Sequence, residues 1–154
     1  MEILAQAPPR TDSAEFWLFL HILGGMATVG ALTLGLASLA GAWRSGSAAL
    51  TRLGFRALLW GAIPAYLVLR ISAQVLLDEE GLEDADLAWV DIGFMVTEPG
   101  LLLLIAATVL GGLAARRAGE DGGPSVGARI ATGLVALLLV AYLVAVWAMT
   151  TRPA

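Results

Sequence analysis

The sequence predicts an all-α protein, a transmembrane four-helix bundle that forms one domain over residues 1–154. Hydrophobic residues make up 58% of the chain and charged residues only 14%, whereas soluble domains have about 45–50% and about 25%. The apolar residues fall into four blocks, and each block reaches the ~20 residues that a helix needs to cross a bilayer. No block carries a polar stripe as wide as a helix of a soluble bundle must show.

The first predicted helix, residues 16–42, has small residues along one face. At steps of three and four residues, this face consists of His21, Gly24, Thr28, Ala31, Gly35 and Ser38. Membrane helices pack closely through such faces, because lipid gives them no hydrophobic reason to associate. We therefore expect this face to meet another helix, with His21 at its end as a hydrogen-bonding or ligand-binding group.

The second predicted helix, residues 57–77, carries a polar stripe of Tyr66, Arg70 and Gln74 at steps of four residues. A polar stripe in a membrane helix is expected to point into the bundle and away from lipid. Pro64 lies one turn before this stripe, and it should kink the helix because it removes a backbone hydrogen bond.

The third predicted helix, residues 89–115, places Asp91, Met95 and Glu98 on one face. At about 1.5 Å per residue, Glu98 lies at nearly the same depth as His21 and Arg70. We therefore expect a polar cluster in which Arg70 pairs with Glu98, because neither charge is favourable in a membrane alone.

The segment "VTEPG" leaves an alternative for this helix. Thr97 is a good N-cap and Pro99 suits the first turn, so the helix can also begin near Thr97 instead of near Trp89. Glu98 would then lie nearer the membrane surface, and Asp91 would be the other candidate partner for Arg70. The fourth predicted helix, residues 130–150, is apolar throughout.

The arginines predict how the chain is oriented. Two short loops are flanked by Arg44, Arg52, Arg56, Arg116, Arg117 and Arg129. The positive-inside rule places these loops in the cytoplasm, so both termini and the acidic segment 78–91 face outward. All nine basic residues are arginine, which is typical of a GC-rich bacterial genome. The expected location is therefore a bacterial inner membrane.

Few kinds of catalytic or metal site are compatible with this composition. The chain has no cysteine and one histidine, which excludes thiolate chemistry and argues against a transition-metal cluster. Ser38 and Ser72 are poorly placed to act with His21 as a nucleophile. A b-type haem would require His21 together with a methionine such as Met95, which is chemically sound but otherwise unsupported. We therefore expect no cofactor and no enzymatic activity.

The stretches "HILGGMATVGALTLG", "WGAIPAYLVLR" and "FMVTEPGLLLLIA" resemble small four-helix membrane proteins of bacteria that have no assigned function. The plan, with a histidine followed by small residues in the first helix, is also similar to the membrane part of copper-resistance D-type proteins. This resemblance implies a multi-pass membrane protein. Copper transport asks for clusters of methionine or histidine, and the four methionines here are scattered, so no functional residue carries over.

Two functional hypotheses remain open from the sequence. In the first, the chain is a structural or accessory membrane component, and the polar cluster locks the bundle. In the second, the same cluster binds haem, a quinone or a proton in a small redox or transport component. The expected partners are the lipid bilayer and a membrane protein or further copies of the chain, not nucleic acid.

Overall fold

The computed structural model describes residues 12–81, 88–118 and 126–151. These residues form helices joined by short turns, and the predicted all-α fold is confirmed. The helices are α1 (Asp12–Ser45), α2 (Ala48–Arg56), α3 (Ile63–Glu80), α4 (Ala88–Arg117) and α5 (Val126–Thr151). A π-helical turn, η1 (Ala57–Ala62), joins α2 to α3 without a break.

Four continuous helical spans are long and apolar enough to cross a membrane. They are α1, the run from α2 through η1 to α3, α4 and α5. Each span extends past the apolar block that predicted it, most of all at the start of the second, which begins at Ala48 instead of residue 57. Hydropathy detects only the apolar centre of a helix, whereas the backbone hydrogen bonds continue through flanking charged residues such as Arg52.

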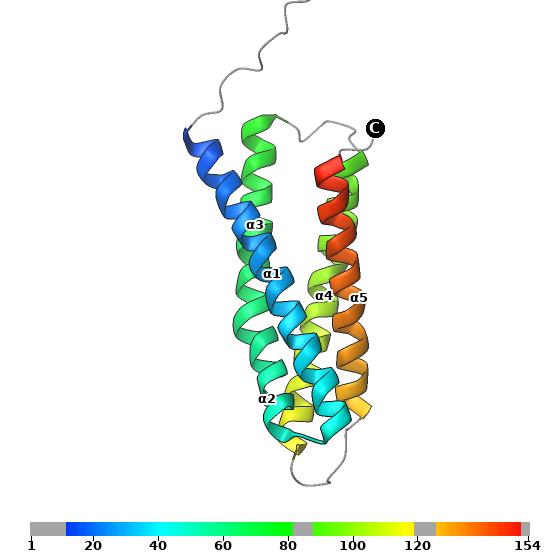
Figure 1. Cartoon of the computed structure of the whole chain (residues 1–154). Helices are drawn as coiled ribbons and strands as arrows, with labels where there is room; N and C mark the ends of the chain where they lie inside the picture. The colour runs from blue at the N-terminus through cyan, green and yellow to red at the C-terminus, as the bar shows by residue number, and fades with distance from the viewer. Residues whose placement is uncertain (1–11, 82–87, 119–125, 152–154) are drawn as a thin grey trace, which may run out of the picture.

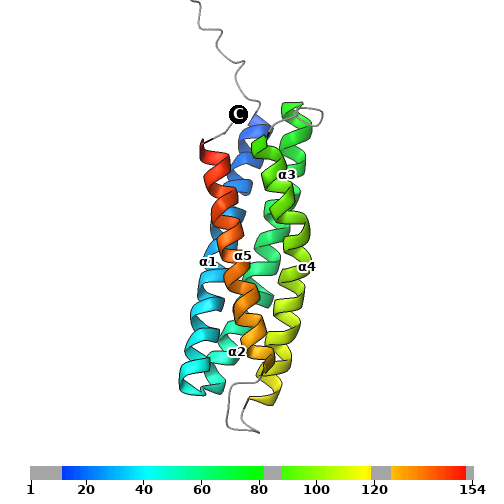
Figure 2. The ribbon, with the colours of Figure 1, turned by 90° about the vertical axis from the view of Figure 1, so that its right-hand side faces the viewer.

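The spans lie side by side along one axis, as Figures 1 and 2 show from two sides. The main contacts pair α1 with α3 and α4 with α5, and α1 also packs along α5. The helices α3 and α4 make far fewer contacts with each other, although they are consecutive in the chain. The bundle is therefore built from two tightly packed pairs, with a weaker junction between α3 and α4.

The two ends of the bundle carry opposite charge. The arginine end, where α1 finishes and α5 begins, carries Arg44, Arg52, Arg56, Arg116, Arg117 and Arg129. The acidic end, where α1 begins and α3 finishes, carries Asp12, Glu15, Asp78, Glu79, Glu80 and Asp91. At the acidic end, the Ser13 hydroxyl donates a hydrogen bond of 2.5 Å to the Glu79 carboxylate and ties α1 to α3.

The face of small residues on α1 meets α3, as expected. A Cβ atom added at Gly24 would lie 2.7 Å from the backbone nitrogen of Leu69, closer than real Cβ contacts come. In the contact of α1 with α2, a Cβ added at Gly54 would lie 2.7 Å from Leu39 Cγ and 3.3 Å from the backbone oxygen of Gly35. Glycine at these positions lets the two backbones approach until they touch, which maximises dispersion contacts between helices.

The π-helical turn explains how the second span keeps one side in the core. Its buried residues Gly54, Leu58, Ala62 and Tyr66 recur at three successive steps of four residues. Each step overshoots an α-helical turn by about 40°, so the three together drift by about 120°. The π turn inserts one extra residue and absorbs most of this drift. The interruption expected at Pro64 thus takes the form of a π turn that ends just before the proline, with Ile63 N–H donating to Leu58 O.

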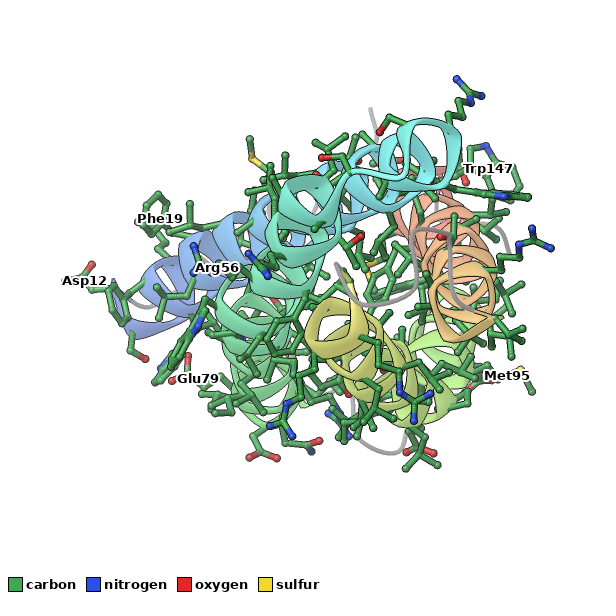
Figure 3. All side chains as sticks on the ribbon, turned by 90° about the horizontal axis from the view of Figure 1, so that it is seen from below. Asp12, Phe19, Arg56, Glu79, Met95 and Trp147 are labelled. Atoms are coloured by element: carbon green, nitrogen blue, oxygen red, sulfur yellow. The ribbon has the colours of Figure 1, made fainter. Side chains whose placement is uncertain are left out.

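The outside of the bundle is apolar. Large side chains that are at least 70% exposed include Met26, Trp60, Met95, Leu102 and Val126. In Figure 3, Phe19, Met95 and Trp147 point away from the helices. An apolar surface of this extent is stable when lipid covers it, and the fold therefore agrees with a multi-pass membrane protein.

Candidate functional site

Tyr66 on α3 is the residue around which the candidate site is arranged. Its side chain is 2% exposed, and its hydroxyl donates a 2.9 Å hydrogen bond to the backbone oxygen of Thr97 on α4. The Thr97 hydroxyl itself donates to Gly93 O within α4. Tyr66 therefore provides a hydrogen bond across the weak junction of α3 with α4. It reaches this position because the π turn keeps it on the buried side of its span.

Arg70 lies one turn beyond Tyr66 and is only half-buried. Its guanidinium carbon lies 4.8 Å from the centre of the Phe94 ring on α4, within cation–π range. One guanidinium nitrogen donates a 3.0 Å hydrogen bond to Gln74 Oε1 on the exposed side of α3. In the part of the chain that the structure describes, Arg70 forms no ion pair with Glu98 or Asp91. The expected Arg70–Glu98 pair is not formed within the chain.

The orientation of α4 explains why this pair does not form. Gly93, Gly100 and Ala107, at steps of seven residues, are buried. A Cβ added at Gly93 or Gly100 would meet Met149 or Tyr142 of α5, so the packing on α5 fixes which way α4 turns. Asp91, Met95 and Glu98 do share a face, as predicted, but it is the exposed face of α4. The six predicted site residues are therefore not one buried cluster.

The third span begins at Ala88, close to Trp89, and continues through Thr97 and Pro99. The alternative start near Thr97 does not occur. Pro99 is accommodated inside α4, and the nearby Thr97 oxygen accepts a hydrogen bond from the Tyr66 hydroxyl on α3. Asp91 consequently lies in the first turn of α4 at the acidic end, away from the middle of the bundle.

Arg70 and Glu98 nevertheless lie at matching depths along the bundle. Arg70 follows Arg52 by 18 residues, and Glu98 precedes Arg116 by 18 residues, so each lies about 27 Å from the arginine end. Glu98 directly follows Thr97, whose backbone oxygen accepts the Tyr66 hydrogen bond, and Arg70 lies one turn beyond Tyr66. We call the surface that carries Arg70, Gln74, Phe94 and Glu98 the α3–α4 seam.

His21 contacts the backbone of α3 and not the seam. It is half-buried, and its Nδ1 lies 3.3 Å from the carbonyl oxygen of Leu69. A carbonyl only accepts, so Nδ1 carries the proton in this hydrogen bond. Leu69 O also accepts a 3.0 Å hydrogen bond from the buried Ser72 hydroxyl. His21 thus links α1 to α3, while Met95, the other proposed haem ligand, is 77% exposed on α4.

The structure does not bring His21 and Met95 together as an axial pair. Within residues 12–81, 88–118 and 126–151, no group of three or more histidine, cysteine or acidic side chains is placed to hold a metal ion. Any haem would need a different second ligand or a ligand from another chain.

Tyr142 on α5 is a site residue that the sequence reasoning missed. It is 3% exposed, and its hydroxyl has no hydrogen-bond partner among the described residues. The hydroxyl faces Gly100 of α4, where an added Cβ would lie 3.5 Å away. The available signal was its spacing, because Tyr142 follows Val135 and Leu138 on the buried side of α5.

Comparisons with known proteins add no family to this description. No protein-family model, curated protein or solved structure matches the chain.

Proposed function

We propose that this chain is a non-catalytic accessory protein of a membrane, which acts by binding another membrane protein along the α3–α4 seam. The proposal is based on where Arg70 and Glu98 lie and on the absence of an ion pair between them. Both lie within membrane-spanning helices, both reach the surface of the bundle, and neither pairs with the other.

Charged side chains in membrane helices almost always face the bundle interior, a water-filled cavity or an opposite charge. Arg70 retains guanidinium donors beyond the hydrogen bond to Gln74, since a guanidinium has five N–H groups. Glu98 is exposed and has no hydrogen-bond or ion-pair partner among the described residues. A protein that covered the seam would supply the missing partners.

The position of the two charges fits a lateral contact. A residue about 27 Å from the arginine end lies just inside the opposite boundary of a hydrocarbon layer about 30 Å thick. At this depth a charge is tolerated in the free protein, at a cost below the about 2.5–3.5 kcal/mol that applies at a helix centre. The contact can therefore form and dissociate without leaving an unstable monomer.

The location proposed for the protein is a bacterial inner membrane, with the arginine end in the cytoplasm and both termini outside. The charge asymmetry of the two ends supports this orientation through the positive-inside rule. The partner-binding seam then lies in the outer half of the bilayer.

Site-specific photocrosslinking in native membranes tests the proposal. A photoreactive residue at Ile71, which is 56% exposed beside Arg70, should give a defined protein adduct. The matched control is Leu137 on α5, which is also 56% exposed but lies away from the seam. The adduct at Ile71 should be lost when Arg70→Gln is added. Equal adducts from both positions, or an adduct indifferent to Arg70, would contradict a seam-specific partner.

The Tyr142 hydroxyl supports a second candidate, a small redox or transport component that binds a ligand with a hydrogen-bond acceptor, such as a quinone. A buried hydroxyl without a partner is destabilising by about 1–3 kcal/mol, and an acceptor oxygen from a ligand would relieve this cost. Mass spectrometry of organic extracts from the purified protein tests it. A quinone retained by the natural sequence and lost in Tyr142→Phe is the expected result, and equal quinone content in both would exclude this candidate.

A further inference from the structure

We infer that the partner on the α3–α4 seam is a second copy of this chain, held by two reciprocal ion pairs between Arg70 of each copy and Glu98 of the other. This inference rests on the proposed function and names its partner. It follows from where the two charges lie on the two helices.

The seam carries its opposite charges on different helices. The α3 side presents Leu67, Arg70, Ile71 and Gln74 at positions i, i+3, i+4 and i+7, which form one stripe. The α4 side presents Glu98, Leu102 and Ile105 at positions i, i+4 and i+7. The cation therefore belongs to the α3 stripe and the anion to the α4 stripe.

Two-fold symmetry brings these two stripes together. When two copies face each other across an axis that runs along the bundle and passes in front of the seam, α3 of one copy lies opposite α4 of the other. In such an isologous contact, if residue i of one copy contacts residue j of the other copy, then residue j of the first copy also contacts residue i of the second. The same rotation thus places Arg70 opposite the partner's Glu98, and Glu98 opposite the partner's Arg70.

The depths of Arg70 and Glu98 along the bundle are compatible with this arrangement. A rotation about an axis parallel to the bundle leaves every residue at its own depth. Arg70 and Glu98 both lie 18 residues from an arginine of the arginine end, so they remain level with each other between the two copies. Had their depths differed by several turns, the rotation could not have paired them.

Apolar side chains of the seam can supply the rest of the contact. Leu67 is 47% exposed, Ile71 56%, Leu102 70% and Ile105 44%. In lipid these residues drive association only through packing, because lipid tails are as apolar as they are. The ion pairs therefore define the register and the partner, as charges do at other interfaces.

Charge reversal with two differently tagged copies tests the inference. An Arg70→Glu chain has two negative charges on its seam, and a Glu98→Arg chain has two positive charges. When each variant is co-expressed with a tagged copy of itself, co-purification should fall about tenfold or more below the natural chain, since like charges then face each other. When the two variants are co-expressed together, every facing pair is opposite in charge, and co-purification should return to about the natural level.

This rescue separates a contact between copies from any effect within one chain. Neither variant contains an opposite pair of its own, so only association between chains can restore the balance. Circular dichroism and size-exclusion chromatography of each variant check that it still folds. If a reversal prevents folding, Arg70→Gln and Glu98→Gln replace it. Each should weaken self-association, and mixing the two should restore part of it, because one Arg70–Glu98 pair then forms between the two chains.

The inference is overturned if the natural chain does not co-purify with itself from membranes, or if the mixed reversal pair associates no better than either variant alone. A phospholipid phosphate bound to Arg70, or an unrelated membrane protein on the seam, would give that second result. If the Ile71 photoadduct still forms and contains a different protein, the proposed function stands and only the identity of the partner is wrong. If the adduct is also absent, both fail.

Discussion

The contact of Gly24 with α3 yields the sharpest prediction for stability. Replacing Gly24 by alanine adds one Cβ atom, which would lie 2.7 Å from Leu69 N and 3.2 Å from Ala65 O. Both obstructing atoms belong to the backbone, so no side chain can move aside. Ordinary contact begins near 3.4 Å, and α1 must therefore move away from α3 by about 0.7 Å at this point.

The cost of this movement can be separated from the change in helix propensity. Overpacking a close contact typically costs about 1–3 kcal/mol, while alanine favours a helix over glycine by about 0.8–1.0 kcal/mol. Gly30 is the matched control, because it lies on the same helix and an added Cβ there meets nothing within 4 Å. The difference in unfolding free energy between Gly24→Ala and Gly30→Ala is then the packing cost alone.

Thermal unfolding in detergent, followed by circular dichroism, measures this difference. For a chain of this size, about 1–3 kcal/mol corresponds to a melting temperature about 2–12 °C lower for Gly24→Ala than for Gly30→Ala. The 3.3 Å contact of His21 Nδ1 with Leu69 O should also be lost, because a shift of this size takes it beyond hydrogen-bond range. Equal melting temperatures for the two variants would refute the close approach of α1 to α3.

Further predictions concern the tyrosines, the orientation and the haem. Tyr66→Phe should destabilise the protein by about 0.5–1.5 kcal/mol, because it removes the bond to Thr97 O. Tyr142→Phe should leave stability unchanged or raise it, since the lost hydroxyl has no partner, and a loss instead would reveal an acceptor. The chain has no cysteine, so Ser45→Cys and Asp78→Cys should react with an impermeant thiol reagent from the cytoplasm and from outside, respectively. Reaction of both from one side would contradict the four-span fold. Protein purified from haem-replete cells should show no Soret band, and a band lost on His21→Ala would contradict this.

The sequence was sufficient for the four spans and for the side of α1 that packs on another helix. These features depend on local patterns, namely long apolar blocks and small residues at helical spacing, and lipid imposes both of them.

The direction in which Glu98 points was not readable from the sequence. The polar residues of α4 suggested that their face was the inner one, whereas Gly93 and Gly100 on another face were the residues that decided the packing on α5. In α4 the close approach of two backbones decides the orientation, and the pairing of two charges near the membrane surface does not. Tyr142 was missed because the residue that it faces, Gly100, lies on another helix.

The π turn Ala57–Ala62 marks a place where the second span can change its length by one residue. Because the turn accommodates one residue more than a regular helix needs, deleting a single residue here would restore an α-helix and leave everything beyond it facing as before. Tyr66 would still face Thr97 and the seam would still carry Arg70, whereas a deletion from a regular part of the helix before them would rotate them by about 100°. The span therefore tolerates many exchanges of one apolar residue for another, as at Trp60, which is 76% exposed. It also tolerates the loss of one residue from the π turn, and natural variants of this segment should differ by substitution or by that single deletion.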